Sequence, residues 1–251
     1  MSLERKHAVV TGGGTGIGLA IANALINEGA IVTIMGRDLK RLQKIAEHNP
    51  QMHAVSVDIT DENSVLEAIN SARLTAPIDM LVNNAGDADS GPFQNMDLKR
   101  WQYMIALNLT GTFLMTHAVI QEMLENKQGN IINIASTAGV IGYAYTTSYC
   151  AAKHGVVGLT KSLAKEMKAH NIFINAICPG YANTDLVMDA VKKIMAAKGK
   201  TKQEAIAGLL EPSGQERLIE PNEIAEVAIE LCHNNQNGEC IIIDGKIRNN
   251  E

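Results

Sequence analysis

The 251-residue chain has few aromatic residues, few cysteines and no long apolar run. Aromatic residues make up 4% of it, and Cys150, Cys178, Cys232 and Cys240 show no CxxC spacing. This cysteine pattern argues against a disulfide framework and favours a reduced cytoplasmic protein. No uninterrupted apolar run approaches the roughly 18 residues of a membrane-spanning helix. The charged N-terminal residues lack the apolar stretch of a secretory leader. We therefore expect a cytoplasmic protein without a membrane partner.

Neither sign of charge is in large excess. Lys and Arg total 22 and Asp and Glu total 27, a net charge of −5. A mildly acidic chain has no global electrostatic reason to bind nucleic acid. The seven histidines form no HExxH or similar pattern, so we expect no metal site. With 46% hydrophobic and 20% charged residues, the composition is that of a folded protein.

Short strand-like runs alternate with amphipathic helical stretches along the whole chain. The runs lie at 7–11, 31–35, 53–57, 78–82, 130–135, 173–177 and 240–243, and helical patterns cover 17–28, 64–72, 112–125, 148–169 and 221–232. Apolar strands that alternate with helices indicate parallel βαβ units with helices on both faces of the sheet. We predict a three-layer, doubly wound α/β fold with a seven-stranded parallel sheet, formed by a single domain over residues 1–251.

The segment 181–220 between the last two strands is much longer than the usual connection of about 2–6 residues. It holds helical patterns at 186–198 and 203–210. Long excursions at the carboxyl edge of a parallel sheet are where substrate sites are built. Alternatively, the segment is an insertion with no role in substrate binding. We favour a helical substrate lid.

A glycine-rich turn follows the first strand directly and leads into a helix. Its spacing is Gly12-x₃-Gly16-x-Gly18, with Thr15 and Ile17 between the glycines. Backbone amides and the positive end of a helix dipole at such a turn bind phosphate. No Lys-Ser/Thr pair follows, so the turn is not a P-loop.

The motifs as a set resemble the short-chain dehydrogenase/reductase family. They are Thr11–Gly18, Asn83-Asn84-Ala85-Gly86, Asn108, Ser136, Tyr149-x₃-Lys153 and Pro179-Gly180. The resemblance is closest to the branch of 3-hydroxyacyl-CoA and 3-hydroxybutyrate dehydrogenases. It implies a Rossmann-like sheet, NAD(P)(H) as hydride carrier, and a homodimer or homotetramer. The cofactor contacts it implies are Gly12, Thr15, Gly16, Ile17, Gly18, Asp58, Ile59, Asn84, Gly86, Tyr149, Lys153, Pro179, Gly180 and Thr184.

The end of the second strand bears on the choice between NAD and NADP. Gly36 stands where NAD-preferring relatives carry Asp, and Arg37 follows it. An arginine there can bind a ribose 2′-phosphate, whereas an acid would repel it. Alternatively, Arg37 is a solvated turn residue and Asp38 only caps the next helix. We favour NADP(H) and keep NAD(H) as possible.

Tyr149 and Lys153 are four residues apart in a helical pattern and should share one face. A phenol loses its proton at about pH 10, and we expect the Lys153 ammonium and a positive nicotinamide to lower that pKa. Tyr149 could then exchange a proton with the substrate oxygen. Ser136 would hold the substrate carbonyl. By resemblance, Asn108 widens a helix turn and supports a water that links Lys153 to solvent.

Each of these four residues also has an ordinary structural explanation. Tyr149 could be a packed aromatic residue, Lys153 a solvated one, Ser136 a helix cap and Asn108 a satisfied core amide. Together with the glycine turn, the set favours a catalytic group.

The expected substrate pocket is lined by small or apolar residues and could take an acyl chain or a ring. The hydroxybutyrate branch holds a carboxylate with two Gln, a His and a Lys, where this chain has Ala88, Ala138, Thr146 and Met188. A free hydroxy acid would leave its carboxylate unpaired, so we exclude it. We expect substrate contacts from Ser136, Ala138, Tyr143, Tyr149 and Met188, with Ala88, Val140, Tyr145 and Leu186 as further lining.

A run of lysines in the lid suggests a phosphate-bearing carrier. Lys192, Lys193, Lys198, Lys200 and Lys202 could meet coenzyme A or an acyl-carrier protein, or could be a solvated helix face. We favour an NAD(P)(H)-dependent oxidoreductase that interconverts a 3-hydroxyacyl and a 3-oxoacyl thioester. One alternative is a reductase of free cyclic or aromatic ketones. A non-enzyme alternative is a cofactor-sensing protein on a retired dehydrogenase fold.

Overall fold

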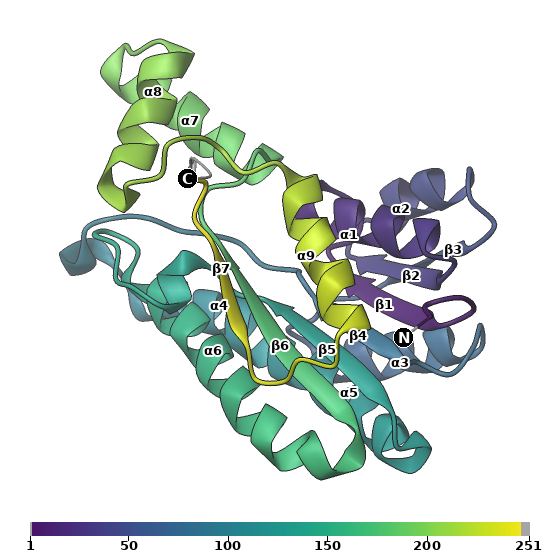
Figure 1. Ribbon diagram of the computed structural model, residues 1–251. Helices are drawn as coiled ribbons and strands as arrows, with labels where there is room; N and C mark the ends of the chain where they lie inside the picture. Colours follow the sequence, from purple (N-terminus) through teal and green to yellow (C-terminus); the bar gives the residue numbers. More distant parts are fainter. Residues whose placement is uncertain (1, 247–251) are drawn as a thin grey trace, which may run out of the picture.

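Short runs rich in valine and isoleucine form the strands, and the central ones are almost wholly buried because helices cover both faces of the sheet. The computed structural model describes residues 2–246, so the expected domain range extends past it at both ends. Seven strands lie in this range: β1 (His7–Thr11), β2 (Ile31–Gly36), β3 (Met52–Ser56), β4 (Met80–Asn83), β5 (Gly129–Ile134), β6 (Ile172–Pro179) and β7 (Cys240–Ile243). They form one parallel sheet in the order β3-β2-β1-β4-β5-β6-β7, which confirms the predicted Rossmann-like architecture (Figure 1).

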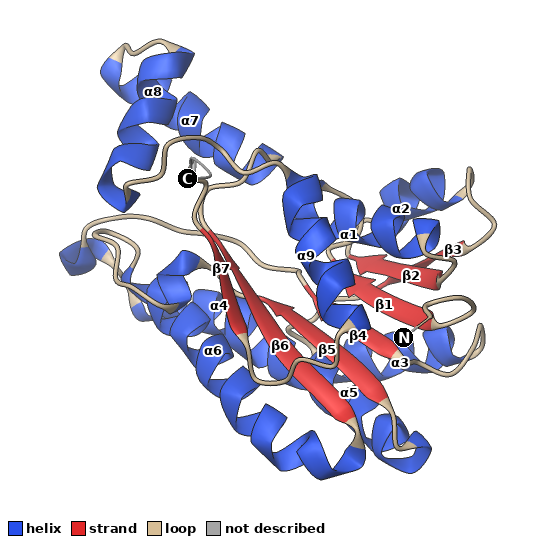
Figure 2. Ribbon diagram, in the orientation of Figure 1, coloured by secondary structure: helices blue, strands red, loops and turns tan. Residues whose placement is uncertain are grey.

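Helices form a layer on each face of the sheet (Figure 2). One layer holds α1 (Gly16–Asn27), α2 (Leu39–Ala46) and α9 (Pro221–His233). The other holds α3 (Glu62–Arg73), α5 (Gly111–Asn126) and α6 (Thr147–Met167), with α4 (Leu98–Ile105) leading toward α5. Each layer packs its own apolar core on the sheet, around Leu25 and Leu231 on one side and Ile69 and Val119 on the other.

Three helices begin where an aspartate caps the first turn. Asp38, Asp61 and Asp97 accept hydrogen bonds from backbone amides three residues further on, at the starts of α2, α3 and α4. The periodicity analysis did not identify α2 and α4 as helices. Both are only eight residues long, too short for a clear helical period.

The carboxyl edge of the sheet is where the fold leaves room for a ligand. β2 and β4 flank β1, so the chain runs outward in opposite directions from this point and opens a crevice beyond the strand ends. α7 (Asp185–Lys198) and α8 (Lys202–Leu210) project beyond this edge (Figure 1). They are the two helical pieces expected in the lid.

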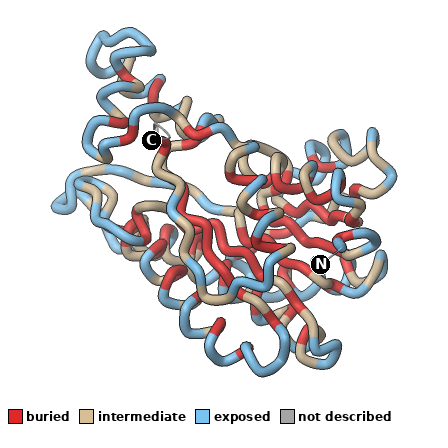
Figure 3. Tube along the Cα trace, viewed as in Figure 1, coloured by how far each residue is buried: buried red, intermediate tan, exposed pale blue. Residues whose placement is uncertain are grey.

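The helical path Leu98–Asn126 runs from α4 through a π-helical turn, Ala106–Thr110, into α5. By length and composition alone it could cross a bilayer. Its apolar side, with Met115, Val119 and Met123, is buried in the core under the sheet. Figure 3 shows this pattern throughout: buried segments follow the strands and the inner sides of the helices, and exposed segments face outward. Core packing therefore accounts for the apolar character of the path.

His7, at the amino edge of the sheet, is a buried titratable group. Its Nδ1 lies 2.8 Å from the Ala76 carbonyl oxygen, and its Nε2 lies 2.8 Å from Thr33 Oγ1. Burial lowers the pKa of His7 from its ordinary value of 6.5 and outweighs the hydrogen bond to Ala76, which raises it. The unfolded chain thus takes up a proton near pH 6.5 that the folded protein resists, and stability falls as the pH drops below this value.

We expect the His7 contribution to appear in urea unfolding at different pH values. The free energy of unfolding should fall between about pH 7.5 and pH 5.5, with His7 contributing up to about 1.4 kcal/mol per pH unit. His7→Gln, which cannot titrate, should give a shallower slope. Equal slopes for the two proteins would contradict this assignment.

Candidate active site

The glycine-rich turn after β1 leaves the N-terminus of α1 open. Within residues 2–246, no side chain caps α1 at Thr15, and its first turn has no acidic residue. Gly12 and Gly16 have φ of +63° and +51°, values that glycine adopts without strain. A Cβ on Gly18 would overlap the Gly12 carbonyl oxygen, so the turn is closed tightly on the helix. Free amides at the positive helix end fit the pyrophosphate of a dinucleotide.

Asn84 braces this turn. Its Nδ2 donates to the carbonyl oxygens of Thr11 at 3.0 Å and Gly12 at 3.3 Å, and its backbone amide donates to Thr11 Oγ1 at 3.0 Å. The Asn84 side chain thus ties β4 to β1 at the turn expected to bind the cofactor. Ile17, in the same turn, is partly buried and packs against the core.

Asp58 and Ile59, the residues expected to flank the adenine, follow β3. Asp58 Oδ1 accepts hydrogen bonds from the Thr60 amide at 3.0 Å and from Thr60 Oγ1 at 2.7 Å, and these bonds lower the pKa of Asp58. Ile59 is buried, and a Cβ on Gly111 would lie 2.7 Å from its Cδ1. The Ile59 side chain therefore belongs to the core, and only its backbone is available to a nucleotide.

Two arginines lie near the end of β2. Arg37 is close enough to Asp58 to lower the pKa of that carboxyl group further. Arg41 approaches the glycine turn from α2, with its Cδ 4.0 Å from the position of a Cβ on Gly14. Among the described residues, neither arginine forms an ion pair. The sequence analysis missed Arg41 because it did not identify α2.

Tyr149 and Lys153 lie one turn apart on α6 and face the same side. Lys153 Nζ lies 5.7 Å from the centre of the Tyr149 ring. The lysine is 5% exposed, and its Nζ donates to the Ile134 carbonyl oxygen at 2.8 Å. α6 thus carries both groups to the end of β5, and the Ile134 carbonyl fixes the position of the ammonium.

The pKa of Tyr149 differs from the sequence-based expectation. Burial of the hydroxyl raises it to about 12, which outweighs a hydrogen bond with Ser136 that acts in the opposite direction. Burial also lowers the pKa of Lys153 to about 8. The groups of the chain alone therefore do not make Tyr149 acidic. They hold it as a neutral phenol, ready to donate a proton.

Ser136 lies directly after β5, where the chain turns toward α6. Its Oγ accepts a hydrogen bond from the Ala138 amide at 3.1 Å, and the side chain lies close enough to the Tyr149 hydroxyl to lower the pKa of that group. Ser136 therefore both caps a short turn and contacts the phenol. The structural and the catalytic explanations of this residue are compatible.

Asn108 sits inside the π-helical turn, as the family resemblance implied. It is 1% exposed, and its Nδ2 donates to the Met104 carbonyl oxygen at 3.1 Å. Its Oδ1 accepts from the Asp87 amide at 3.3 Å. A Cβ on Gly86 would lie 2.6 Å from this Oδ1 and 3.7 Å from Lys153 Nζ, so Asn108 and Lys153 both approach Gly86.

The far end of the crevice is formed by the chain after β6. Pro179 ends that strand, and the Gly180 amide donates to the Ile243 carbonyl oxygen at 2.8 Å. Thr184 starts α7, and its Cγ2 would lie 3.1 Å from a Cβ on Gly16. The lid therefore begins directly beside the glycine turn.

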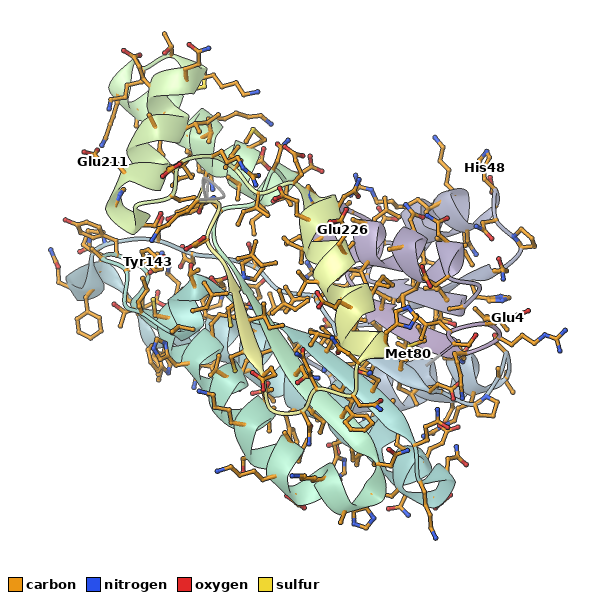
Figure 4. The ribbon with its side chains drawn as sticks, viewed as in Figure 1. Glu4, His48, Met80, Tyr143, Glu211 and Glu226 are labelled. Atoms are coloured by element: carbon orange, nitrogen blue, oxygen red, sulfur yellow. The ribbon has the colours of Figure 1, made fainter. Side chains whose placement is uncertain are left out.

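The expected substrate residues differ in exposure. Ala138 is 4% exposed and packs below the surface, whereas Met188 on α7 and Tyr143 are partly exposed. Tyr143, on the loop below the lid helices (Figure 4), donates its hydroxyl to Thr137 Oγ1 at 3.0 Å. An exposed apolar rim comprises Phe93, Val140, Ile141, Tyr145 and Leu186.

Two further residues of the site escaped the sequence analysis. Tyr181 and Asp87 both lie close enough to Tyr149 to raise the pKa of its hydroxyl. Asp87 forms no ion pair within the part of the chain that the structure describes. Tyr181 directly follows Gly180, and Asp87 directly follows Gly86. Their positions beside these glycine motifs were the sequence signal for both residues. Asp87 places a negative charge near the expected reaction centre.

The model of the short chain dehydrogenase family matches residues 6–194. The chain belongs to this family. As a short-chain dehydrogenase it is an oxidoreductase that uses a nicotinamide cofactor and acts on a secondary alcohol or the matching ketone. The open helix end and the close glycine turn of this chain fit such a cofactor.

Other short-chain dehydrogenases and reductases are similar over most of the chain. A 3-oxoacyl-acyl-carrier-protein reductase, FabG, of Aquifex aeolicus is 35% identical over 238 residues, 92% of each chain. A Xanthobacter autotrophicus protein named inactive 2-(S)-hydroxypropyl-CoM dehydrogenase 2 is 36% identical over 214 residues, 84% of this chain and 90% of its own. A solved actinorhodin polyketide ketoreductase variant with NADPH has a TM-score of 0.90 and 30% identity, covering 96% of each chain.

Proposed function

We propose that this short-chain dehydrogenase reduces a 3-oxoacyl thioester to the 3-hydroxyacyl thioester, or catalyses the reverse reaction, with NADP(H) as cofactor. The observation that carries the proposal is the convergence of Ser136, Tyr149 and Lys153 at the carboxyl ends of β5 and β6, next to the open end of α1. The domain acts as one unit with its lid over residues 181–220.

Tyr149 is the proton donor to the substrate oxygen in the direction of reduction. With a pKa of about 12 it is a neutral phenol at neutral pH, and its proton is available. Ser136 lies beside the Tyr149 hydroxyl, where its own hydroxyl would hold the substrate oxygen and stabilise the developing charge. When bound, the nicotinamide cofactor supplies or accepts the hydride.

Lys153 and Asn108 restore the proton on Tyr149. Lys153 has a pKa of about 8 and can release and regain a proton near neutral pH. The π-helical turn sets Asn108 Oδ1 toward Gly86, which Lys153 Nζ also approaches. A water held between these groups would connect Lys153 to solvent.

Arg37 and Arg41 provide the preference for NADP(H). Both are exposed cations without an ion pair in the described range, and together they flank the space beyond β2 and the glycine turn. A 2′-phosphate there would gain charge-assisted hydrogen bonds from two sides. Tyr149 and Lys153 add the contacts to the nicotinamide ribose that the family resemblance implies.

Substitution of Arg37 by Asp should reverse the cofactor preference. We expect KM for NADPH to rise by at least about tenfold, since a hydrogen bond to a charged group contributes roughly 1.5–3 kcal/mol. Arg41→Ala should act in the same direction. Lys44→Ala, an exposed cation on the same helix, is the matched control. Steady-state kinetics with NADPH and NADH measure the ratio, and an unchanged ratio in Arg37→Asp would refute the assignment.

The residues expected to contact the substrate support an esterified rather than a free acid. Asp87 near Tyr149 would repel a substrate carboxylate, and Ala88 and Met188 offer it no cationic partner. The exposed rim around Phe93 and Tyr145, 68% and 65% exposed, suits an acyl chain and its linker.

The lid lysines support a carrier with phosphate groups, although one of them is engaged. Lys192 pairs with Asp189 at 2.7 Å, whereas Lys193, Lys198, Lys200 and Lys202 are exposed or partly exposed and form no ion pair within the described residues. Replacing these four by Gln should raise KM for acetoacetyl-CoA by about tenfold, because rim charges attract a phosphate-bearing ligand. KM for a small neutral ketone should stay constant. Equal changes in KM for both substrates would contradict the proposed phosphate-bearing carrier.

Turnover measurements with different substrates test the two alternative functions. A reductase of free cyclic or aromatic ketones is favoured by the rim aromatics and would turn over those ketones faster than any thioester. A cofactor-sensing protein would bind NADPH and turn over nothing, a possibility made concrete by the relative named inactive. Acetoacetyl-CoA, longer 3-oxoacyl-CoAs and simple ketones, each with NADH and NADPH, separate the three outcomes.

We further propose a cytoplasmic homodimer or homotetramer. Support comes from the exposed aromatic side chains of Tyr103 on α4 and Phe113 on α5, 45% and 46% exposed, which a second copy would cover. Light scattering of the purified protein measures the mass directly, and a monomer would refute this.

A further inference from the structure

The two ends of the lid are joined at its base. The chain leaving β6 passes through Tyr181–Asn183, and the chain returning to α9 passes through 215–220. The Ile219 amide donates to the Tyr181 carbonyl oxygen at 3.0 Å, and the Asn183 amide donates to the Ile219 carbonyl oxygen at 2.8 Å. Ala182 and Ile219 pair as a parallel β-bridge. A short two-stranded ladder thus joins the two ends of the lid at the point where they meet the sheet.

The Gln215 side chain extends this ladder by acting like a peptide group. Its Oε1 accepts from the Tyr181 amide at 2.8 Å, and its Nε2 donates to the Tyr181 carbonyl oxygen at 2.8 Å. The same Nε2 donates to the Arg217 carbonyl oxygen at 2.6 Å. Gln215 is 6% exposed, so these bonds form away from water and an unmade one would be costly.

Two glycines make room for this side chain. A Cβ on Gly180 would overlap Gln215 Oε1. Gly245 has φ +61°, and a Cβ on it would lie 2.9 Å from Gln215 Cγ and 3.0 Å from its Nε2. Gln215 therefore fills a slot between the chain after β6 and the chain after β7, and it is fixed on both sides.

We propose that Gln215 is a positioning residue that holds the Gly180–Tyr181 peptide at the entrance of the active site, so that lid motion begins beyond Asn183. This rests on the proposed function, in which Gly180 and Tyr181 border the cofactor and substrate. Gln215 touches neither reacting group and acts through the backbone of Tyr181.

The chemistry of the amide makes the proposal specific. Position 215 needs an acceptor for one amide and donors for two carbonyl oxygens, which only a side-chain amide supplies together. The substitution Gln215→Glu would keep the acceptor, but the ionised carboxylate would face the two carbonyl oxygens. Burial would raise the pKa of that carboxyl group, and its protonated form could donate one bond again. Acid should therefore partly restore the variant.

Hydrogen exchange tests the contact without any substrate. The Tyr181 amide should exchange about tenfold faster in Gln215→Leu than in the wild type, as expected for the loss of one buried hydrogen bond. Amides in the centre of β6 should not change. Gln203→Leu, an exposed position on α8, is the matched control. An unchanged Tyr181 amide would overturn the proposal whether or not the proposed substrate is correct.

Kinetics test the positioning role. Gln215→Glu should lower kcat by about tenfold at pH 8 and recover by about threefold relative to the wild type at about pH 6. Gln203→Glu should follow the wild type at both values. If Gln215→Glu keeps the melting temperature of the wild type, loses kcat and does not recover in acid, the proposed role of the amide is wrong. If the wild type reduces no ketone, the affinity for NADPH replaces kcat in the same comparison.

Discussion

Tyr149→Phe should lose kcat by about a thousandfold, within the 10²–10⁴ range of a positioned proton donor. The substitution removes one oxygen and leaves the ring that packs against Lys153, so folding and cofactor binding should be preserved. Ketone-dependent oxidation of NADPH measures kcat, and nucleotide fluorescence measures the dissociation constant. Only kcat should change.

Tyr103→Phe is the matched control for this experiment, because Tyr103 lies on α4 outside the active site and the substitution keeps the ring proposed for the subunit contact. It should behave as the wild type. If Tyr149→Phe retained kcat within about tenfold of the wild type, the phenol would not be the proton donor, and the proposed chemistry would fail.

Gly18→Ala should weaken NADPH binding by at least about a hundredfold, or roughly 2.8 kcal/mol. The added Cβ would lie 2.9 Å from the carbonyl carbon of Gly12 and would also overlap Asn84 Nδ2. The turn would have to move away from α1, and the amides that face the phosphates would lose their alignment. Nucleotide fluorescence titration measures this change.

Gly158→Ala controls for the general effect of adding a methyl group to a helical glycine. A Cβ on Gly158 in α6 meets no atom of the described residues within 4 Å. This variant should bind NADPH normally and gain about 0.5–1 kcal/mol of stability from helix propensity. If Gly18→Ala also bound NADPH normally, the cofactor phosphates would not bind at the glycine turn.

The fold could be predicted from the sequence because its signals are local. Apolar runs of four to eight residues between amphipathic stretches predict parallel strands, and the observed strands begin and end within two residues of their predicted bounds. β6 extends to Pro179 rather than 177 because its end pairs with β7. α4 lacked a clear period, and its only sequence signal was the cap Asp97.

The finer features of the site depend on contacts between distant segments. Nothing near Asn84 in the sequence shows that its amide binds Thr11, and nothing near Ile59 shows that Gly111 covers it. The expected lowering of the Tyr149 pKa includes a bound nicotinamide; in the chain alone burial raises this pKa, and burial does not show in the sequence. Gln215 was not predicted because its partner Tyr181 lies far away in the sequence.

The ladder at the base of the lid has a consequence for how such a scaffold diversifies. Residues 181–183 lie beside Gln215 and Ile219, so the helical segment 185–214 can change in length or sequence while the strand ends stay in place. Closing a longer loop between fixed ends costs little free energy, about 0.6 kcal/mol per doubling of length. A different lid can therefore replace this one and change the substrate selectivity, while the residues proposed for hydride transfer stay the same.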